Sequence, residues 1–438
     1  MSPLSTPSLP AIGRPRNPAQ VVAWIRPAIA AAADPAVLLR AAAPPSGGCA
    51  VLALGKASRT LAAEANRLWG NSITSGLVIT LDDRPLPPNL RGTFARVRGS
   101  HPLPNQHSLR AGRRVRSFLQ SLPPEQTLVV LLSGGASAQV VLPRADLLVS
   151  DIAEISRRLM RAGAPIEDLN MVRRHVDLLK GGGLAQLHPG PIRAFILSDV
   201  VGDPLHVIGS GPTTHDPTTF ADALDVLTRH RLLTAVPTIT RFFRRGMAGS
   251  GFETPKRSLG PRIINTVIGN NRGLIASVAA HLRGRGVYVA ASHPNTIGAA
   301  SDVGRSAART AIAMAGGGNP SCVIWGGEWT VTVGRQRGKG GPSQEAALAA
   351  AIELDGVPDV AVWTFSTDGR DGPTDFCGGL VDGTTAQRIR AKGLNPVELL
   401  RTHSSSKALA AAGAIEAAGP TETNLNHIAI AIATPRRV

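Results

Sequence analysis

TLVVLLSGGASA, residues 127–138, is the stretch from which the fold can be deduced. A short run of Val and Leu that ends in a glycine-rich turn is typical of a buried strand, and the small residues after the turn suit the start of a helix. Free N–H groups at such a turn attract anions. We therefore predict a strand–turn–helix unit in which Ser133, Gly134, Gly135 and Ser137 bind an anionic cofactor. A tight turn that is needed only for packing explains the same residues equally well.

Short apolar runs and helical segments alternate on both sides of this unit. The pattern predicts an α/β fold of two domains, each a mainly parallel sheet flanked by helices. Further strands are expected at residues 50–54, 77–81, 195–198, 287–291, 322–325, 330–333, 361–365 and 427–434. Further helices are expected at residues 18–43, from 106 onward, and at 149–162, 271–283, 301–314 and 344–354. Because glycine turns follow several of the strands, ligands should bind at the carboxyl ends of the strands.

Composition shifts divide the chain into segments. Residues 1–17 are expected to form a disordered tail, and residues 18–245 a Rossmann-like N-terminal domain. The stretch 246–261 is rich in Gly, Pro and charge, as linkers are. Residues 262–438 then form a C-terminal α/β domain.

The formal net charge of +17 raises the question of nucleic acid, but the arginines are spread along the chain and aromatic residues make up only 3%. We therefore expect no nucleic-acid partner, and a positive field that attracts anionic substrates. Prolines interrupt the N-terminal stretch where a signal peptide needs an apolar run, and no apolar segment is long enough to cross a membrane. The three cysteines show no metal-type pairing. These features predict a soluble cytoplasmic protein.

Two lysines stand beside glycine turns. ALGKAS places Lys56 at a strand end, where its ammonium can neutralise a phosphate or carboxylate. LLKGGGLA places Lys180 before Gly181 and Gly182, where its ammonium can neutralise an anionic group in the same way. The alternatives are an exposed lysine at a helix start for Lys56, and a solvated lysine beside a helix end for Lys180.

Two carboxylates follow the strand at 195–198. In SDVVGDPLHVIGSGPTTHDPTTFADA, Asp199 and Asp203 can hold Mg²⁺ on a triphosphate, or one of them can act as a base toward a hydroxyl group. The alternative is that one of them caps a turn. His101, in GSHPLP, is either a base or an ordinary loop residue.

The second half of the chain carries further charged candidates. STDGRDGPTD contains Asp368 and Asp371, which can contact a metal or substrate or simply cap a turn. The stretch 326–347 is expected to join a hairpin to a helix start and contains Glu328 with a group of cations. Those cations are Arg335, Arg337 and Lys339.

In their order, these motifs resemble the D-glycerate 2-kinase family. The pieces that carry the resemblance are ALGKAS, GSHPLP, LLSGGASA, NMVRRHVDLLKGGGLA, the stretch 198–223, ETPK, GGEWTVTV, GKGGPSQEAAL, STDGRDGPTD and TNLN. They extend from about residue 50 to residue 426. The resemblance implies transfer of a phosphoryl group from ATP, with Mg²⁺, to the 2-hydroxyl of D-glycerate, which gives 2-phospho-D-glycerate. It also implies an active site in the cleft between the two domains and a C-terminal MOFRL-type domain at about 320–435.

The resemblance also implies roles for the candidate residues. Lys56 matches a lysine of the family's active site, and Lys180, Asp199 and Asp203 match motif positions and are predicted to be catalytic, the two aspartates also as metal ligands. Cofactor-binding roles are predicted for the two glycine turns and for Arg337 and Lys339. Substrate contacts are predicted for His101, Glu328, Asp368 and Asp371.

Three positions depart from the family pattern. Pro342 stands where the family has an arginine, His427 where it has an aspartate, and Ala136 where it has a glycine. Proline is tolerated in a first helical turn, so the fold should survive at Pro342. We predict that Arg337 or Lys339 supplies the missing positive charge.

Alternatives to the kinase remain open at this point. One is a hydroxypyruvate reductase, although the chain lacks a complete G-x-G-x-x-G pattern. Others are a kinase or a non-catalytic binding protein for a different sugar acid. The sequence leaves open which sugar acid is preferred and whether the chain forms a homodimer.

Overall fold

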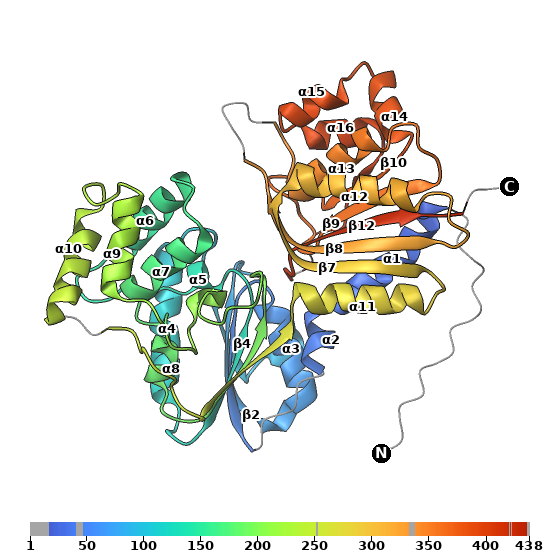
Figure 1. The fold of residues 1–438 in the computed structure, drawn as a ribbon. Helices are drawn as coiled ribbons and strands as arrows, with labels where there is room; N and C mark the ends of the chain where they lie inside the picture. Colours follow the sequence, from blue (N-terminus) through green and yellow to red (C-terminus); the bar gives the residue numbers. More distant parts are fainter. Residues whose placement is uncertain are drawn as a thin grey trace. The chain divides into compact units, whose positions relative to one another are not determined.

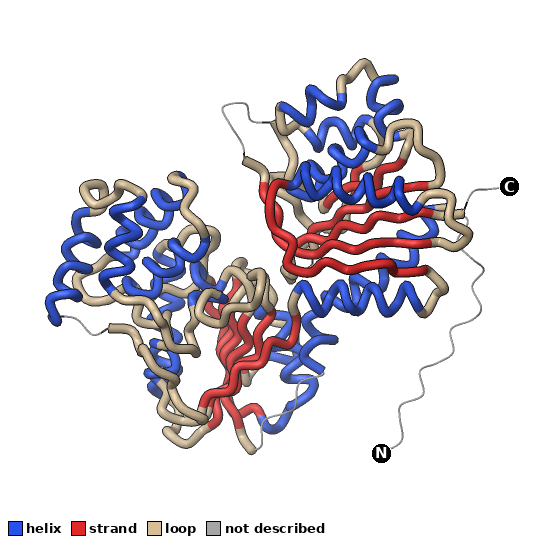
Figure 2. Tube along the Cα trace, viewed as in Figure 1, coloured by secondary structure: helices blue, strands red, loops and turns tan. Residues whose placement is uncertain are grey.

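The computed structural model describes residues 17–40, 47–250, 253–332, 338–419, 421 and 423–435. Within these ranges the chain forms two compact units. The first unit comprises residues 34–270 and 422–425, and the second comprises the other described residues. Each unit contains one six-stranded sheet with helices packed on it, as Figures 1 and 2 show. Across this described part of the chain, no helix combines the length and apolarity that a membrane span needs.

The sheet of the first unit is parallel throughout. Its strands are β1 (Cys49–Leu54), β2 (Ile73–Thr80), β3 (Phe94–Arg98), β4 (Thr127–Leu132), β5 (Ile192–Leu197) and β6 (Ile263–Gly269). They lie in the order β3-β2-β1-β4-β5-β6. The strand order therefore reverses between β1 and β4, and it is at such a switch point that open α/β sheets bind ligands. The strand predicted at 127–132 is confirmed as β4.

Alternating side chains of this sheet form two cores, one on each face. Val51 and Val129 pack toward α3 on one face, whereas Leu52 and Val130 pack toward α4 on the other. This alternation follows from the period of two in a strand, because both faces are covered. The helices near the sheet are α2 (Pro35–Arg40), α3 (Ser58–Trp69), α4 (Gln106–Ser121), α5 (Ala136–Gln139) and α8 (Gly183–Leu187).

Four more helices of the first unit form a separate bundle with its own apolar core (Figure 1). They are α6 (Val149–Arg161), α7 (Ile166–Val176), α9 (Phe220–Arg229) and α10 (Pro237–Arg245). Phe220 and Phe243 are among the largest fully buried side chains of the bundle. The bundle places α7, which carries the RRH run of the sequence, between α6 and α9.

The sheet of the second unit is mostly antiparallel, so the prediction of a mainly parallel sheet is wrong here. Its strands are β7 (Tyr288–Ala299), β8 (Ser321–Thr330), β9 (Val360–Ser366), β10 (Gly378–Asp382), β11 (Ile415–Glu416) and β12 (His427–Ala433). Only β7 and β8 pair in parallel. Strands β9 and β10, which the loop of residues 367–377 joins, pair antiparallel, and β12 lies antiparallel to both β8 and β9. The strand expected at 322–325 lies within β8. Of the strand expected at 330–333, Thr330 ends β8, Val331 and Thr332 are not in a strand, and residue 333 lies outside the described residues.

Helices cover both faces of this second sheet. They are α1 (Pro18–Ala33), α11 (Asn271–Arg283), α12 (Ala300–Met314), α13 (Pro342–Glu353), α14 (Thr385–Ala391), α15 (Pro396–Arg401) and α16 (Ser405–Ala411). Helices α1 and α11 pack together on one face, and α12 and α13 on the other (Figure 1).

The compact units differ from the domain boundaries expected from the sequence. Helix α1 belongs to the second unit, although it comes first in the chain, because it packs on α11, β9 and β12. Strand β6 completes the first sheet beyond the expected linker, since it pairs with β5. Residues 1–16 of the expected tail lie outside the described residues.

Candidate functional site

Two turns meet at the switch point of the first sheet, one after β1 and one after β4. Each turn binds the other through its backbone: the N–H of Lys56 donates to the carbonyl of Gly134 at 2.9 Å, and the N–H of Ser133 to that of Leu54 at 3.0 Å. The Ser133 hydroxyl accepts from the N–H of Ala57 at 3.0 Å. Gly55 has a φ of 102°, and a Cβ there would lie 2.3 Å from the Ser133 carbonyl oxygen, so only glycine fits. Ser133 therefore holds the two turns together from a buried position.

The SGGAS turn, residues 133–137, presents unused backbone donors. Within the described residues, the N–H groups of Gly134, Gly135, Ala136 and Ser137 have no hydrogen-bond acceptor. Gly135 and Ser137 are only half-buried, so the turn is accessible from solvent. Successive free N–H groups of this kind form a concave site for an anion.

Lys56, His101 and Asp199 surround this turn. A Cβ on Gly135 would lie 3.2 Å from His101 Cδ2 and 3.4 Å from Lys56 Cγ, and a Cβ on Gly134 would lie 2.1 Å from Asp199 Oδ2. The closing TNLN segment also reaches Asp199, because Asn424 Nδ2 donates to Asp199 Oδ2 at 3.5 Å. The structure therefore brings together three of the residues that the sequence singled out.

The surroundings of His101 favour its neutral form. Desolvation by the surrounding protein and the positive charges of Lys56 and Arg173 lower the pKa of the His101 imidazole, although the residue as a whole is exposed. A neutral imidazole can accept a proton or donate a hydrogen bond at pH 7.

Asp203 lies farther along the same loop. Its Oδ2 accepts a hydrogen bond from Asn270 Nδ2 at 2.5 Å, just after β6. Its φ of 56° lies in the left-handed region, which aspartate and asparagine adopt in turns more often than most residues do. This geometry matches the turn-forming alternative better than it matches a base. Across the part of the chain that the structure describes, no three His, Cys, Asp or Glu side chains cluster as a metal site.

The KGGG turn, residues 180–183, has a different arrangement. The N–H groups of Gly181 and Gly182 donate to the carbonyls of Ser210 and Gly211 at 2.9 and 2.7 Å. Lys180 is 3% exposed, and its Nζ bonds Asp177 Oδ2 at 2.5 Å and the Val140 carbonyl at 3.0 Å. Burial lowers the pKa of Lys180, and the charge of Asp177 opposes this shift. These contacts give Lys180 and the two glycines a structural role within the described residues, and the catalytic and cofactor-binding roles predicted for them stay predictions.

The stretch 198–223 is held by a second buried ion pair. Arg174 Nε donates to Asp216 Oδ1 at 2.8 Å, and these side chains are 2% and 0% exposed. Thr218 and Thr254 complete the hydrogen bonds of the Asp216 carboxylate. The positive charge of Arg174 and the hydrogen bonds to Thr218 lower the pKa of Asp216 against the opposing effect of burial. Much of this unusual stretch therefore serves the fold.

In the second unit, Asp371 caps α13. Its two carboxylate oxygens accept from the N–H groups of Ser343 and Gln344 at 3.0 and 2.7 Å. Burial raises the pKa of Asp371 to about 7, while these two hydrogen bonds favour the charged form. Pro342 is the first residue of α13, where a proline has no N–H bond to lose, so the expected survival of the fold is confirmed.

The other predicted residues of the second unit are more accessible. Glu328 and Lys339 are exposed, and Asp368 is half-buried and accepts from Ser366 Oγ at 3.0 Å. Asn426 Nδ2 lies 3.4 Å from Glu328 Oε2. Arg335 and Arg337 lie outside the described residues.

The His427 ring is held by one aromatic contact and one polar contact in the second unit. Its ring stacks on Trp329 with centroids 5.1 Å apart, and its Nδ1 is 2.9 Å from Ser343 Oγ. Burial lowers the pKa of His427 to about 4, so the ring is neutral. His427 therefore contacts Ser343, the residue that follows Pro342, so two of the positions that depart from the family pattern lie next to each other.

The sequence analysis assigned no role to three further side chains of the first unit, although two of them, Asn170 and Arg173, lie in the motif NMVRRHVDLLKGGGLA. Gln139 Oε1 accepts from the N–H of Gly55 at 3.0 Å, and its side chain is fully buried. Arg173 is 8% exposed, and Asn170 accepts from Ser210 Oγ at 2.9 Å. All three stand on helices whose pattern explains them as ordinary helical residues, so no local signal separates them.

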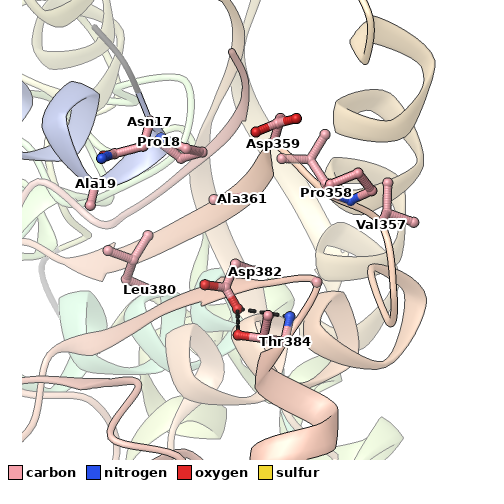
Figure 3. A pocket seen from close by; sticks show the side chains of 12 residues that line it. Asn17, Pro18, Ala19, Val357, Pro358, Asp359, Ala361, Leu380, Asp382 and Thr384 are labelled. Carbon is pink, nitrogen blue, oxygen red and sulfur yellow. Dashed lines mark hydrogen bonds between the residues drawn. The ribbon is translucent and has the colours of Figure 1, made fainter. Parts of the chain in front are cut away.

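A pocket in the second unit lies apart from these residues (Figure 3). It is lined by residues 17–19, 357–361, 380 and 382–384, and has a volume of about 290 Å³. The Asp382 carboxylate at its edge is already bound by the N–H and hydroxyl of Thr384. None of the sequence-predicted site residues lines it, so we do not assign it to the candidate site.

Two family models match successive parts of the chain. A domain of unknown function (DUF4147) matches residues 18–244, and the MOFRL family matches residues 321–427. The chain is 37% identical over 346 residues to the glycerate 2-kinase of Pyrococcus horikoshii, which covers 78% of each protein. It is 34% identical over 417 residues, 93% of each protein, to a protein of Agrobacterium vitis provisionally named a hydroxypyruvate reductase. The crystal structure of glycerate kinase from Thermotoga maritima superposes with a TM-score of 0.83 at 31% identity, covering 94% of this chain and 99% of that one.

Fold and site together define a two-sheet α/β protein with a glycine turn of unused backbone donors at the switch point of its parallel sheet, within the described residues. The family models and relatives then identify the group: the chain belongs to the glycerate kinase family. The family resemblance seen in the sequence motifs is thereby confirmed.

Proposed function

We propose that this protein transfers the terminal phosphoryl group of ATP to the 2-hydroxyl of D-glycerate and releases 2-phospho-D-glycerate. The observation that carries the proposal is the convergence of Lys56, Asp199 and the unused N–H groups of the SGGAS turn at the ends of β1, β4 and β5. Relatives named glycerate kinase or glycerate 2-kinase support the choice of substrate.

In this proposal the SGGAS turn binds phosphate oxygens of ATP. Its four N–H groups supply donors that need no rearrangement, and the Lys56 ammonium adds a positive charge beside Gly135. Such preorganised donors stabilise the negative charge that spreads over the transferring phosphoryl group.

Asp199 is our candidate for the acidic group of the reaction. Its carboxylate packs against Gly134, whereas the Asp203 carboxylate is held by Asn270. Mg²⁺ is commonly held by one or two carboxylates together with phosphate oxygens, so Asp199 fits a magnesium ligand without a dedicated cluster. When bound, the ion would neutralise phosphate charge. His101 is neutral beside the same turn and is our second candidate for contact with the substrate hydroxyl.

The second unit supplies further proposed contacts. Glu328, Asp368 and Lys339 are the predicted residues that its described surface leaves accessible. The prediction that Lys339 or Arg337 replaces the charge missing at Pro342 stays a prediction. Substituting Pro342→Arg tests it: if this substitution raises D-glycerate turnover tenfold or more, about 1.4 kcal/mol, the present chain has no replacement for that charge.

An ATP-coupled assay with D-glycerate, L-glycerate, tartronate, erythronate and threonate tests the function, and phosphorus NMR locates the new ester. We expect turnover of D-glycerate with a 2-phosphate product. A product phosphorylated at the 3-hydroxyl, or turnover of another acid alone, would contradict the assignment.

The reductase remains the second candidate function, because one relative carries that provisional name. Loss of NADH absorbance with hydroxypyruvate, measured beside the kinase assay, separates the two. We also retain a cytoplasmic location as part of the proposal, supported by three cysteines that are all buried as thiols.

A further inference from the structure

Arg173, on α7, is a buried cation without an ion pair among the described residues. Its side chain is 8% exposed, and its only hydrogen bond within the described residues runs from Nε to Ser156 Oγ at 3.4 Å. No carboxylate of the described chain lies within 4.0 Å of it. Its two terminal nitrogens keep contact with solvent. Burial lowers the pKa of Arg173 to about 10, which leaves it charged at pH 7.

The neighbouring Arg174 shows what a buried guanidinium normally requires. It bonds the Asp216 carboxylate, the His206 carbonyl and the Thr218 hydroxyl, so each nitrogen has an acceptor. A buried charge without such partners is costly. For Arg173, the negative field of Asp177 is the main compensation, and that carboxylate is already bound by Lys180. The donors of Arg173 are therefore available to an external acceptor.

The position of Arg173 connects it to the SGGAS turn. Asn170 and Arg173 stand three residues apart and share one face of α7. Asn170 accepts from Ser210 Oγ at 2.9 Å, and Ser210 is 2.7 Å from Ser137 Oγ. This relay ties the α7 face to the turn, and the charge of Arg173 contributes to the lowered pKa of His101.

We propose that Arg173 binds the carboxylate of the sugar-acid substrate. The N–H groups of residues 134–137, which have no acceptor within the described residues, already provide donors for phosphate. A guanidinium offers two parallel donors that match a carboxylate, and this gives geometric specificity that a lysine lacks. The inference rests on the proposed function, because it names the group that orients the acceptor substrate of that reaction.

Steady-state kinetics of Arg173→Met and Arg173→Lys test the proposal. We expect Arg173→Met to raise KM for D-glycerate about 10- to 100-fold, as loss of a charged hydrogen bond does, with KM for ATP changed less than about threefold. Arg173→Lys should recover part of the loss. Arg161→Met, at an exposed arginine on α6, is the matched control and should behave as the unaltered protein.

The outcomes separate the inference from the function. If KM for D-glycerate is unchanged in both variants, or if KM for ATP rises instead, the proposal is overturned. If Arg173→Met does not fold, Arg173→Lys, which keeps the stem and the charge, decides the question.

If the unaltered protein does not phosphorylate D-glycerate, the proposed function fails, and calorimetric titration with the same acids still tests Arg173. Binding of an acid that Arg173→Met abolishes supports the inference, and equal binding by both proteins overturns it.

Discussion

The first unit contains two glycine turns that look alike in sequence and differ in structure. Within the described residues, the SGGAS turn leaves four N–H groups without acceptors, whereas the KGGG turn uses the N–H groups of Gly181 and Gly182 to hold residues 210 and 211. Each turn has a lysine beside it. Lys56 is half-buried next to Gly135, whereas Lys180 is buried in an ion pair with Asp177.

The difference shows that a glycine turn can bind a ligand only if its backbone N–H donors are not already used within the fold. In the SGGAS turn the cross-links go through the carbonyl of Gly134 and the side chain of Ser133, so the donors stay available. In the KGGG turn the donors themselves are the cross-links. We therefore expect substitutions at one turn to change catalysis and substitutions at the other to change stability.

The largest effect is expected at Lys180. Lys180→Met removes the partner of Asp177, which is fully buried, and should lower the free energy of unfolding by about 3–5 kcal/mol. Denaturant unfolding measures this change. The double variant Lys180→Met/Asp177→Asn removes both charges and should recover part of the loss. Full stability of Lys180→Met together with lost turnover would show that Lys180 is catalytic after all.

The next largest effect is expected at Lys56. Lys56→Ala should lower kcat/KM at least about a hundredfold, because it removes a positive charge beside the transferring phosphoryl group. Its unfolding midpoint should stay close to that of the unaltered protein. Lys392→Ala, at an exposed lysine of the second unit to which no role is assigned, is the matched control and should keep normal turnover. Near-normal turnover of Lys56→Ala would remove this residue from the site.

The smallest effects separate the glycines themselves. Gly182 has a φ of 87° and lies where a Cβ would be 2.9 Å from the Thr214 carbonyl, so Gly182→Ala should cost about 1–2 kcal/mol of stability with kcat unchanged. Gly134→Ala places a methyl group against Asp199 Oδ2 and should lower kcat about tenfold with little loss of stability. Thermal unfolding and steady-state kinetics measure both effects. Lost turnover in Gly182→Ala together with lost stability in Gly134→Ala would contradict the roles given to the two turns.

Much of the first sheet could be predicted from the sequence, since Val and Leu runs before glycine turns define buried strands. The mostly antiparallel second sheet could not, because the position of β12 between β8 and β9 depends on pairings far apart in the chain. Helix α1 joins the second unit for the same reason.

The candidate site was predictable only in part. Lys56, Asp199 and the SGGAS turn were found because each follows a strand of one parallel sheet, and such positions meet at one edge. Arg173 and Arg174 are the same residue type at adjacent positions, and only packing decides which of them receives Asp216. Asp371 was predicted to contact substrate but caps α13, which local sequence does not reveal.

Amide hydrogen exchange, measured by mass spectrometry with and without magnesium ATP, tests the central claim most directly. In the free protein, the amides of residues 134–137 should exchange rapidly, because they have no acceptor among the described residues, and those of Gly181 and Gly182 slowly. Magnesium ATP should protect the first segment and leave the second unchanged. Saturating nucleotide that leaves exchange at residues 134–137 unchanged would contradict the assignment of the SGGAS turn as the phosphate site.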